Sequence, residues 1–225
     1  MRNFEHPVPG FFGLLLQILS GAVFGLMIAV VYLVLKPVHL PDAKAAAKDD
    51  KKGASVNRNV VEYRPGNPGN PSGQQWRLRE RAFLERMPAG VALGEQDLNR
   101  WVASTYGSAE RTFKLESYGL EVTAELPLFR LDGTAMQVGL EYSIKLGEFE
   151  KKIIAQTRGS LEKADGQHGF QPASVHLGSC PLPGRAGEWL VAKLSAAYPV
   201  PENVAASWKA VTSAKLEQSQ LRLSF

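Results

Sequence analysis

One uncharged apolar run near the amino terminus constrains this chain more than any other feature. The run extends from Phe11 to Leu35, and Gln17 is its one strongly polar residue. A helix rises about 1.5 Å per residue, so this run would measure roughly 36 Å, enough to cross a hydrocarbon core of about 30 Å with some tilt. Inside lipid, a single segment satisfies its backbone hydrogen bonds only as a helix. The sequence therefore predicts a short tail over residues 1–10 and a transmembrane helix over residues 11–35.

A cleaved signal peptide is the alternative to a retained anchor. Such a peptide has an apolar stretch of about 7–15 residues, followed by a cleavage site made of small residues. Here the run is longer, and the segment 36–41, with the sequence KPVHLP, follows it directly. A lipoprotein anchor would need a cysteine near the end of the run, but the single cysteine is Cys180. We therefore expect one uncleaved, single-pass anchor.

Small residues recur along one row of the predicted anchor. Gly13, Gln17, Gly21 and Gly25 are spaced four residues apart, which places them on one side of a helix. Two glycines at this spacing let a second helix approach closely, and Gln17 would offer a hydrogen bond across the pair. The row predicts a homo-oligomer or a pairing with another membrane protein. The alternative is that glycine is simply frequent in membrane helices.

The charges beside the run leave the side of the membrane open. Arg2 precedes it, whereas five lysines follow it: Lys36, Lys44, Lys48, Lys51 and Lys52. Counting lysine and arginine alone favours a cytoplasmic carboxyl-terminal part. A short tail in front of a single anchor commonly stays inside, which favours an extracytoplasmic domain instead. We take the extracytoplasmic side as the expectation and keep the cytoplasmic side as its alternative.

Residues 36–75 have the composition of a flexible linker. An Ala/Lys/Asp tract covers 42–52, and a stretch rich in proline and glycine covers 64–73. Such segments bury too little apolar surface to fold and stay solvated. Residues 1–73 carry eight Lys and Arg against five Asp and Glu, of the chain's 26 and 22, which leaves 18 against 17 for the remainder. A remainder this close to neutral lacks the basic face of a nucleic-acid-binding domain.

Residues 76–225 read as one α+β domain. Apolar residues alternate with polar ones from Met136 to Leu146, which predicts a long half-buried strand, and Asp132-Gly133 before it is a favoured hairpin turn. Further strands are expected at 113–117, 120–126, 153–162, 174–178 and 221–225. Helical spacing predicts helices near 76–87, 95–102, 186–197 and 201–211. Their apolar faces are expected to carry Leu98, Trp101 and Val102 in the second helix, Ala186, Trp189, Leu190, Leu194 and Ala197 in the third, and Val204, Trp208 and Val211 in the fourth. Short links imply a long, curved antiparallel sheet that packs on amphipathic helices through one apolar face.

No group of residues in the sequence forms a catalytic or metal-binding motif. His168, His176 and Cys180 lack metal-ligand spacing, and His176 is expected to be exposed. Glu95 and Asp97 would make an acid/base pair only if they faced a substrate, whereas carboxylates in the first turn of a helix already suit its dipole. Nucleotide-binding loops and nucleophile elbows do not occur. We therefore expect no enzyme activity, no cofactor and no metal.

The order of these segments resembles a known family. An anchor and a linker are followed by the pattern Glu95-x-Asp97-Leu98-Asn99-Arg100-Trp101, by alternating strands, and by Pro172-x-x-Val175-x-Leu177-Gly178 and Pro181-Leu182-Pro183. This order is similar to the single-pass bacterial envelope proteins of the YpmS kind and, more distantly, to tubular lipid-binding domains. The resemblance implies an extracytoplasmic domain whose sheet and helices enclose acyl chains, and it brings no catalytic residue with it.

Two functions follow as hypotheses. The first is a non-enzymatic envelope protein that contacts the lipid bilayer through its anchor and binds a lipid or another apolar ligand in its domain. The second is an interaction or scaffold subunit of a membrane protein complex. The interface between sheet and helices decides between them, since it is either a filled core or an apolar groove.

Overall fold

The computed structural model describes residues 11–38, 61–68, 74–107, 111–164 and 166–225; for residues 11–18, 115 and 118 it describes the backbone alone. The helices of the described residues are α1 (Phe11–Leu35), α3 (Gln75–Leu84), α4 (Glu95–Tyr106), α5 (Gly184–Ala197) and α6 (Glu202–Lys209), with a short 3-10 helix η1 (Glu116–Tyr118). The strands are β1 (Val91–Gly94), β2 (Thr112–Leu115), β3 (Leu120–Ala124), β4 (Leu128–Asp132), β5 (Ala135–Leu146), β6 (Phe149–Ala164), β7 (Gln167–Leu177), β8 (Cys180–Pro181), β9 (Ser213–Glu217) and β10 (Gln220–Ser224).

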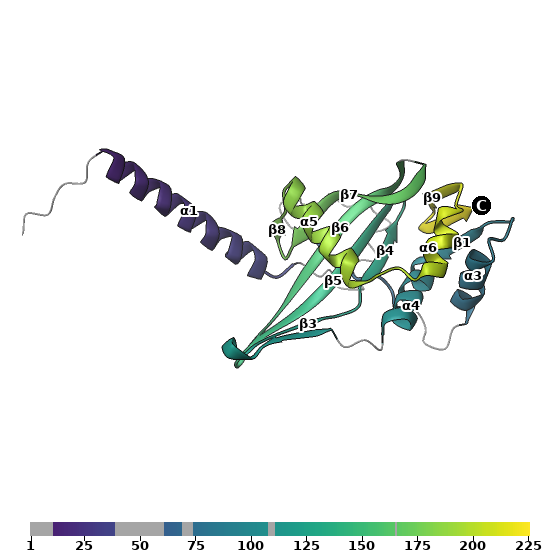
Figure 1. Ribbon diagram of the computed structural model, residues 1–225, viewed down its shortest axis with the longest axis horizontal. Helices are drawn as coiled ribbons and strands as arrows, with labels where there is room; N and C mark the ends of the chain where they lie inside the picture. Colours follow the sequence, from purple (N-terminus) through teal and green to yellow (C-terminus); the bar gives the residue numbers. More distant parts are fainter. Residues whose placement is uncertain (1–10, 39–60, 69–73, 108–110, 165) are drawn as a thin grey trace, which may run out of the picture.

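Helix α1 covers the apolar run and projects from the rest of the molecule (Figure 1). Its side chains are described from Leu19 onward, and large apolar ones are exposed on all sides of it, with Phe24 and Leu26 each 66% exposed. Among the helices of the described residues, none is both long and apolar enough to cross a membrane.

A seven-stranded antiparallel sheet forms the body of the domain. Its order is β2-β3-β5-β6-β7-β8, and β4 pairs with β5 beyond the end of β3. The predicted long strand is confirmed as β5, and Gly133 in the β4–β5 turn has a φ of +61°, which glycine adopts without strain. The predicted α+β class with a large antiparallel sheet is therefore confirmed.

The strand β7 is longer than the sequence predicted, because the sheet accommodates Pro172. Proline has no backbone N–H for a ladder. The register of β6 and β7 shifts between Arg158 and Gly159, which forms a bulge where Pro172 lies opposite Gly159. A Cβ at Gly159 would lie 1.9 Å from the carbonyl oxygen of Gln171, so only glycine fits there. The bulge lets β7 continue past the proline.

A second, three-stranded sheet was not predicted. Its order is β1-β10-β9, and all pairs are antiparallel. Together with α3, α6 and the β4–β5 end of the large sheet it encloses the main core, whose buried members are Phe83, Val91, Leu131, Met136, Val211, Ala214, Leu216, Leu221 and Leu223. The sequence signal for β1 and β9 was weak, because each has only four or five residues.

The helices cover one face of the large sheet, here called the inner face. This face carries the even-numbered residues of β5 and the odd-numbered residues of β6 up to Leu161, among them Val138, Leu140 and Ala155. Helix α5 lies across the long strands, whereas α3, α4 and α6 gather with the second sheet at one end (Figure 1). The packed core is therefore at one end of the inner face, and α5 crosses its middle.

Part of the predicted linker packs on the opposite, outer face. Tyr63 is 5% exposed and lies in one cluster with Val38 and Ile154. A Cβ at Gly139 would lie 2.1 Å from Cε2 of the Tyr63 ring, so the ring lies directly on the strand backbone. Residues 61–68 thus depart from the solvated linker expected over 36–75, because one aromatic side chain buries itself against a glycine of the sheet.

Candidate functional site

The inner face of the large sheet and the helices enclose an apolar cavity of about 460 Å³. The sheet supplies one wall through Val138, Leu140, Ala155, Thr157 and Phe170, and the opposite wall comes from α4 and α5. The lining side chains of α4 are Leu98, Trp101, Val102 and Tyr106. The interface between sheet and helices is thus not a completely filled core.

Helix α5 presents one stripe of side chains to this cavity. The stripe consists of Val191, Leu194, Ser195 and Tyr198, which follow one another at the spacing of a single helix face. The sequence had placed Trp189 on the packed face, and that prediction is wrong, since Trp189 is 62% exposed. Gly187 determines how α5 is rotated about its own axis. A Cβ at this position would lie 3.1 Å from Cγ2 of Val175, so the helix backbone lies close against β7 here.

An aromatic cluster holds the carboxyl end of α5. The rings of Tyr106 and Tyr198 meet edge to face, with centroids 5.5 Å apart, and the Arg111 guanidinium lies 4.9 Å from the Tyr198 ring centroid. The Tyr198 hydroxyl donates a hydrogen bond to the carbonyl of Glu125 (2.8 Å), and the Tyr106 hydroxyl donates to that of Pro199 (2.8 Å). These contacts tie α5 to α4 and to the loop after β3.

A second apolar recess of about 430 Å³ continues the first toward α3 and α6. The two share five lining residues: Leu98, Trp101, Val200, Trp208 and Leu221. The Trp208 indole N–H is satisfied within the protein, because it donates a hydrogen bond to the carbonyl of His168 at 2.7 Å. The two spaces are therefore adjacent, and together they are called the apolar groove.

Several polar groups around the groove are bound within the protein or held neutral. The Thr157 hydroxyl donates to the Ser174 carbonyl (3.2 Å). Burial raises the pKa of Tyr142, on the same sheet face, to about 12, and it also raises the pKa of Tyr106 and of Tyr198. All three phenols are therefore neutral at physiological pH. One polar atom in the wall, Nδ1 of His168, is buried without a hydrogen-bond partner.

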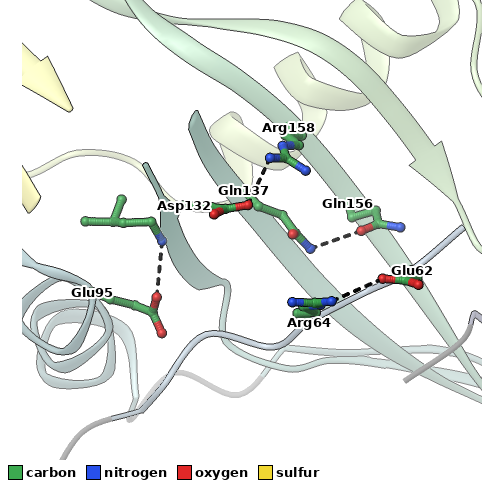
Figure 2. A network of polar contacts seen from close by, with 8 residues as sticks. Glu62, Arg64, Glu95, Asp132, Gln137, Gln156 and Arg158 are labelled. Carbon is green, nitrogen blue, oxygen red and sulfur yellow. Dashed lines mark hydrogen bonds and ion pairs between the residues drawn. The ribbon is translucent and has the colours of Figure 1, made fainter. Parts of the chain in front are cut away.

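Glu95, Asp97 and Asn99 are occupied by backbone contacts. Glu95 accepts hydrogen bonds from the backbone N–H of Asn67 and from that of Leu131 (3.1 Å), and Figure 2 shows its carboxylate reaching from α4 to β4. Asp97 accepts the N–H of Gly94 (2.7 Å) and pairs with Arg79. An acid/base pair is thus not what this geometry provides: both carboxylates hold chain segments together.

Asn99 completes the same joint between α4, β4 and the segment 61–68. Its side-chain amide donates to the carbonyls of Asn67 and Phe129, each at 2.9 Å, and its oxygen accepts the N–H of Phe129 at 2.7 Å. The side chain is 3% exposed. The pattern of alternate polar residues at the start of α4 is therefore explained by architecture.

Side-chain pairs also cross-link the outer face of the large sheet. The Gln137 amide donates to Gln156 across β5 and β6 (3.1 Å), and Arg158 pairs with Asp132 at 2.9 Å (Figure 2). Glu62 and Arg64 form a looser pair, 3.6 Å apart, on the packed segment beside them. Beside the cluster of Val38, Tyr63 and Ile154, the outer face is thus polar and cross-linked by side-chain pairs, whereas the inner face is apolar.

The predicted contact row of α1 is described in part. Gly13 and Gln17 lie outside the residues whose side chains the structure describes. Gly21 and Gly25 lie in α1 with no described atom within 4 Å of a Cβ added to either. Pairing through this row, as a homo-oligomer or with a membrane protein, stays a prediction.

The two histidines among the described residues, His168 and His176, do not come together with other metal-binding side chains. Within the described ranges no group of three or more His, Cys, Asp or Glu residues is arranged to hold a metal ion. His176 is half-buried rather than exposed as expected, and burial lowers its pKa. His168 joins the groove wall through its ring, and its Nε2 lies 3.2 Å from the Thr212 carbonyl oxygen.

Comparison with known proteins adds no relative. No protein-family model matches the chain, and no match is found among curated proteins or solved structures. The geometry of the groove is therefore the evidence that bears on function. The sequence predicted the α4 wall through Leu98, Trp101 and Val102. On the α5 stripe it predicted Leu194 but missed Val191, Ser195 and Tyr198.

Proposed function

We propose that this chain is a membrane-anchored, non-enzymatic binding protein whose α+β domain holds a lipid or another apolar ligand. The apolar groove between the sheet and α4–α6 is the observation that carries the proposal. Its volume falls within the range of about 300–1,000 Å³ typical of small-molecule sites. Because its walls are aliphatic and aromatic, an occupant that removes them from water is stabilised by roughly 25 cal/mol per Å² of apolar surface.

The uncharged run Phe11–Leu35 supports the membrane anchor. It has 25 residues and folds as the helix α1, and most of the apolar side chains described on this helix are exposed. A helix that is apolar all round needs apolar surroundings. An extracytoplasmic, envelope position for the domain belongs to the same proposal, and a phosphatase fused to the carboxyl terminus tests it: an active fusion is expected, and an inactive but well-expressed one contradicts it.

Native mass spectrometry of the full-length protein, purified from membranes, tests the ligand. We expect the wild type to carry an added mass in the range of one lipid. Val191→Trp places an indole in the groove from the α5 stripe and should remove that mass. Ala192→Trp puts the same side chain on an exposed neighbouring position that does not line the groove. It should therefore leave the bound mass unchanged.

Two results would count against the proposal. The first is a wild-type protein that carries no added lipid mass, even at collision energies low enough to preserve non-covalent lipid complexes. The second is equal retention of the added mass by both tryptophan variants, since the lipid would then lie elsewhere on the protein.

A further inference from the structure

The inner face of the large sheet is covered by other elements to different extents along its length. At the end near the second sheet, Met136, Leu161 and Phe170 belong to the main core or pack against it. In the middle, Leu140 and Ala155 line the groove beneath α5. At the third part, around the β5–β6 turn, three large apolar residues are exposed beside three that are half-buried.

We call this third part the apolar tip; it comprises Phe113, Leu120, Val122, Ile144, Leu146 and Phe149. The strand registers place all six on one face: Leu146 lies opposite Leu120 and Phe149, and Val122 lies opposite Phe113 and Ile144. Phe113 is 60% exposed, Phe149 55% and Leu146 49%. Contiguous exposed apolar side chains of this kind mark an interaction surface rather than ordinary scatter.

Helix α1 joins the domain beside the half of β6 that leads to this tip. The turn between β7 and β8 is bound on both sides: the Gly178 N–H donates to the Ile154 carbonyl (2.8 Å), and the Ser179 N–H donates to the Leu33 carbonyl near the end of α1 (3.0 Å). Ile154 is only five positions from Phe149 at the tip, on a strand of 16 residues. Figure 1 shows the end of α1 and the β5–β6 turn on the same side of the domain.

The contact between α1 and the β7–β8 turn is close enough to fix the domain on the helix. A Cβ at Gly178 would lie 2.1 Å from the Val34 carbonyl oxygen, so the two backbones touch. Val38, directly beyond α1, is buried with Tyr63 and Ile154 on the outer face of the same sheet. A membrane that holds α1 would therefore hold the apolar tip at a set position beside it.

We propose that the apolar tip rests on the lipid bilayer and that the inner face forms a continuous apolar path from bilayer to groove. This inference rests on the proposed anchor and deepens the proposed function, because it names the membrane as the source of the ligand. Phe113, Leu146 and Phe149 insert among the lipids as other exposed aromatic and aliphatic side chains do. Lys151 is the one charged residue on this part of the face in β5 and β6, and its long stem lets the ammonium reach a phosphate headgroup.

A labelled full-length protein in phosphatidylcholine vesicles tests this placement. In a Cys180→Ser background, a single environment-sensitive fluorophore is attached at Phe149→Cys or at Glu162→Cys, which is exposed on the same strand near its other end. The label at 149 should show blue-shifted emission and should be quenched by lipids that carry a doxyl group on the acyl chain. The label at 162 should show neither effect.

The test separates this inference from the function on which it rests. If native mass spectrometry finds bound lipid but the label at 149 behaves like the label at 162, the bilayer contact is wrong and the binding function stands. If the label at 149 is quenched but the groove is empty, the bilayer contact stands and the binding function is wrong.

A Phe113→Ser/Phe149→Ser double variant tests the apolar path from bilayer to groove. It should take up pyrene-labelled phosphatidylcholine from vesicles more slowly than wild type, and an unchanged rate would overturn the path.

Discussion

At the scale of single residues, a few small or polar side chains decide where chain segments meet. Gly139 leaves room for the Tyr63 ring on the outer face, and Gly187 lets α5 approach β7. Asn99 satisfies three backbone groups from two segments while it is itself buried. None of these roles depends on local sequence pattern, because each partner lies about 30 or more positions away or on another element.

Substitution of Gly139 tests the packing of Tyr63. Gly139→Ala would place a methyl group inside the Tyr63 ring, so the free energy of unfolding should fall by about 1–3 kcal/mol, as for other overpacked sites. Gly169→Ala is the matched control, because Gly169 is also a strand glycine but has no atom within 4 Å of the added Cβ. There the same change should leave stability unchanged or raise it by up to about 1 kcal/mol.

Denaturant titration measures both variants. Equal effects of the two substitutions would mean that residues 61–68 do not rest on the sheet in solution, and that the predicted solvated linker extends through them after all.

The same residues show what the sequence was able to predict. The pattern Glu95-x-Asp97-x-Asn99 was recognisable as a helix start, and the structure confirms α4 there. Its partners were not predictable, since Leu131, Phe129 and Asn67 lie some 30 residues away in both directions. Carboxylates that accept backbone N–H groups and carboxylates that transfer protons have the same local sequence, and only the tertiary contacts distinguish them.

At the scale of secondary-structure elements, the periodicity of apolar residues predicted where helices and strands occur better than which of their faces is packed. The alternation over β5 and the helical spacing over α4 and α6 placed these elements well, and Val204, Trp208 and Val211 do pack together at the core. Helix α5 was predicted too, but with Trp189 on the packed side. Hydrophobicity favoured tryptophan for that side, whereas the close approach at Gly187 turns Val191 and Leu194 toward the sheet instead.

The role of Gly187 gives a prediction for α5 as a whole. Gly187→Leu would force the helix away from Val175, so α5 should become more mobile and the groove more accessible. Gly184→Leu is the control, because a Cβ at Gly184 meets nothing within 4 Å and the residue lies on the same helix.

Hydrogen exchange of the full-length protein reads out the effect. Amides of α5 should exchange faster in Gly187→Leu than in Gly184→Leu, whereas those of β5 and β6 should be unaffected. Equal protection of α5 in the two variants would contradict the account of how this helix is held.

At the scale of the whole molecule, the inner face of one sheet carries the functional argument. It belongs to the packed core at the end near the second sheet and lines a cavity beneath α5. At the apolar tip it carries the exposed side chains Phe113, Leu146 and Phe149. The α+β class and the apolar face of the sheet were predictable from alternation. The hollow was not, because the same apolar residues would serve equally well in a filled core, and only the separation of the layers creates space.

The central claim is that the hollow under α5 holds an apolar ligand, and photocrosslinking tests it most directly. A benzophenone side chain introduced at Leu194, on the lining stripe of α5, should form a covalent lipid adduct on illumination of cells that express the full-length protein. The same group at Lys193, exposed on the same helix and outside the lining, should form none. Mass spectrometry of the purified protein detects the adduct. A lipid adduct at 194 and none at 193 is the predicted result, whereas no adduct at 194, or equal adducts at both positions, would contradict the account.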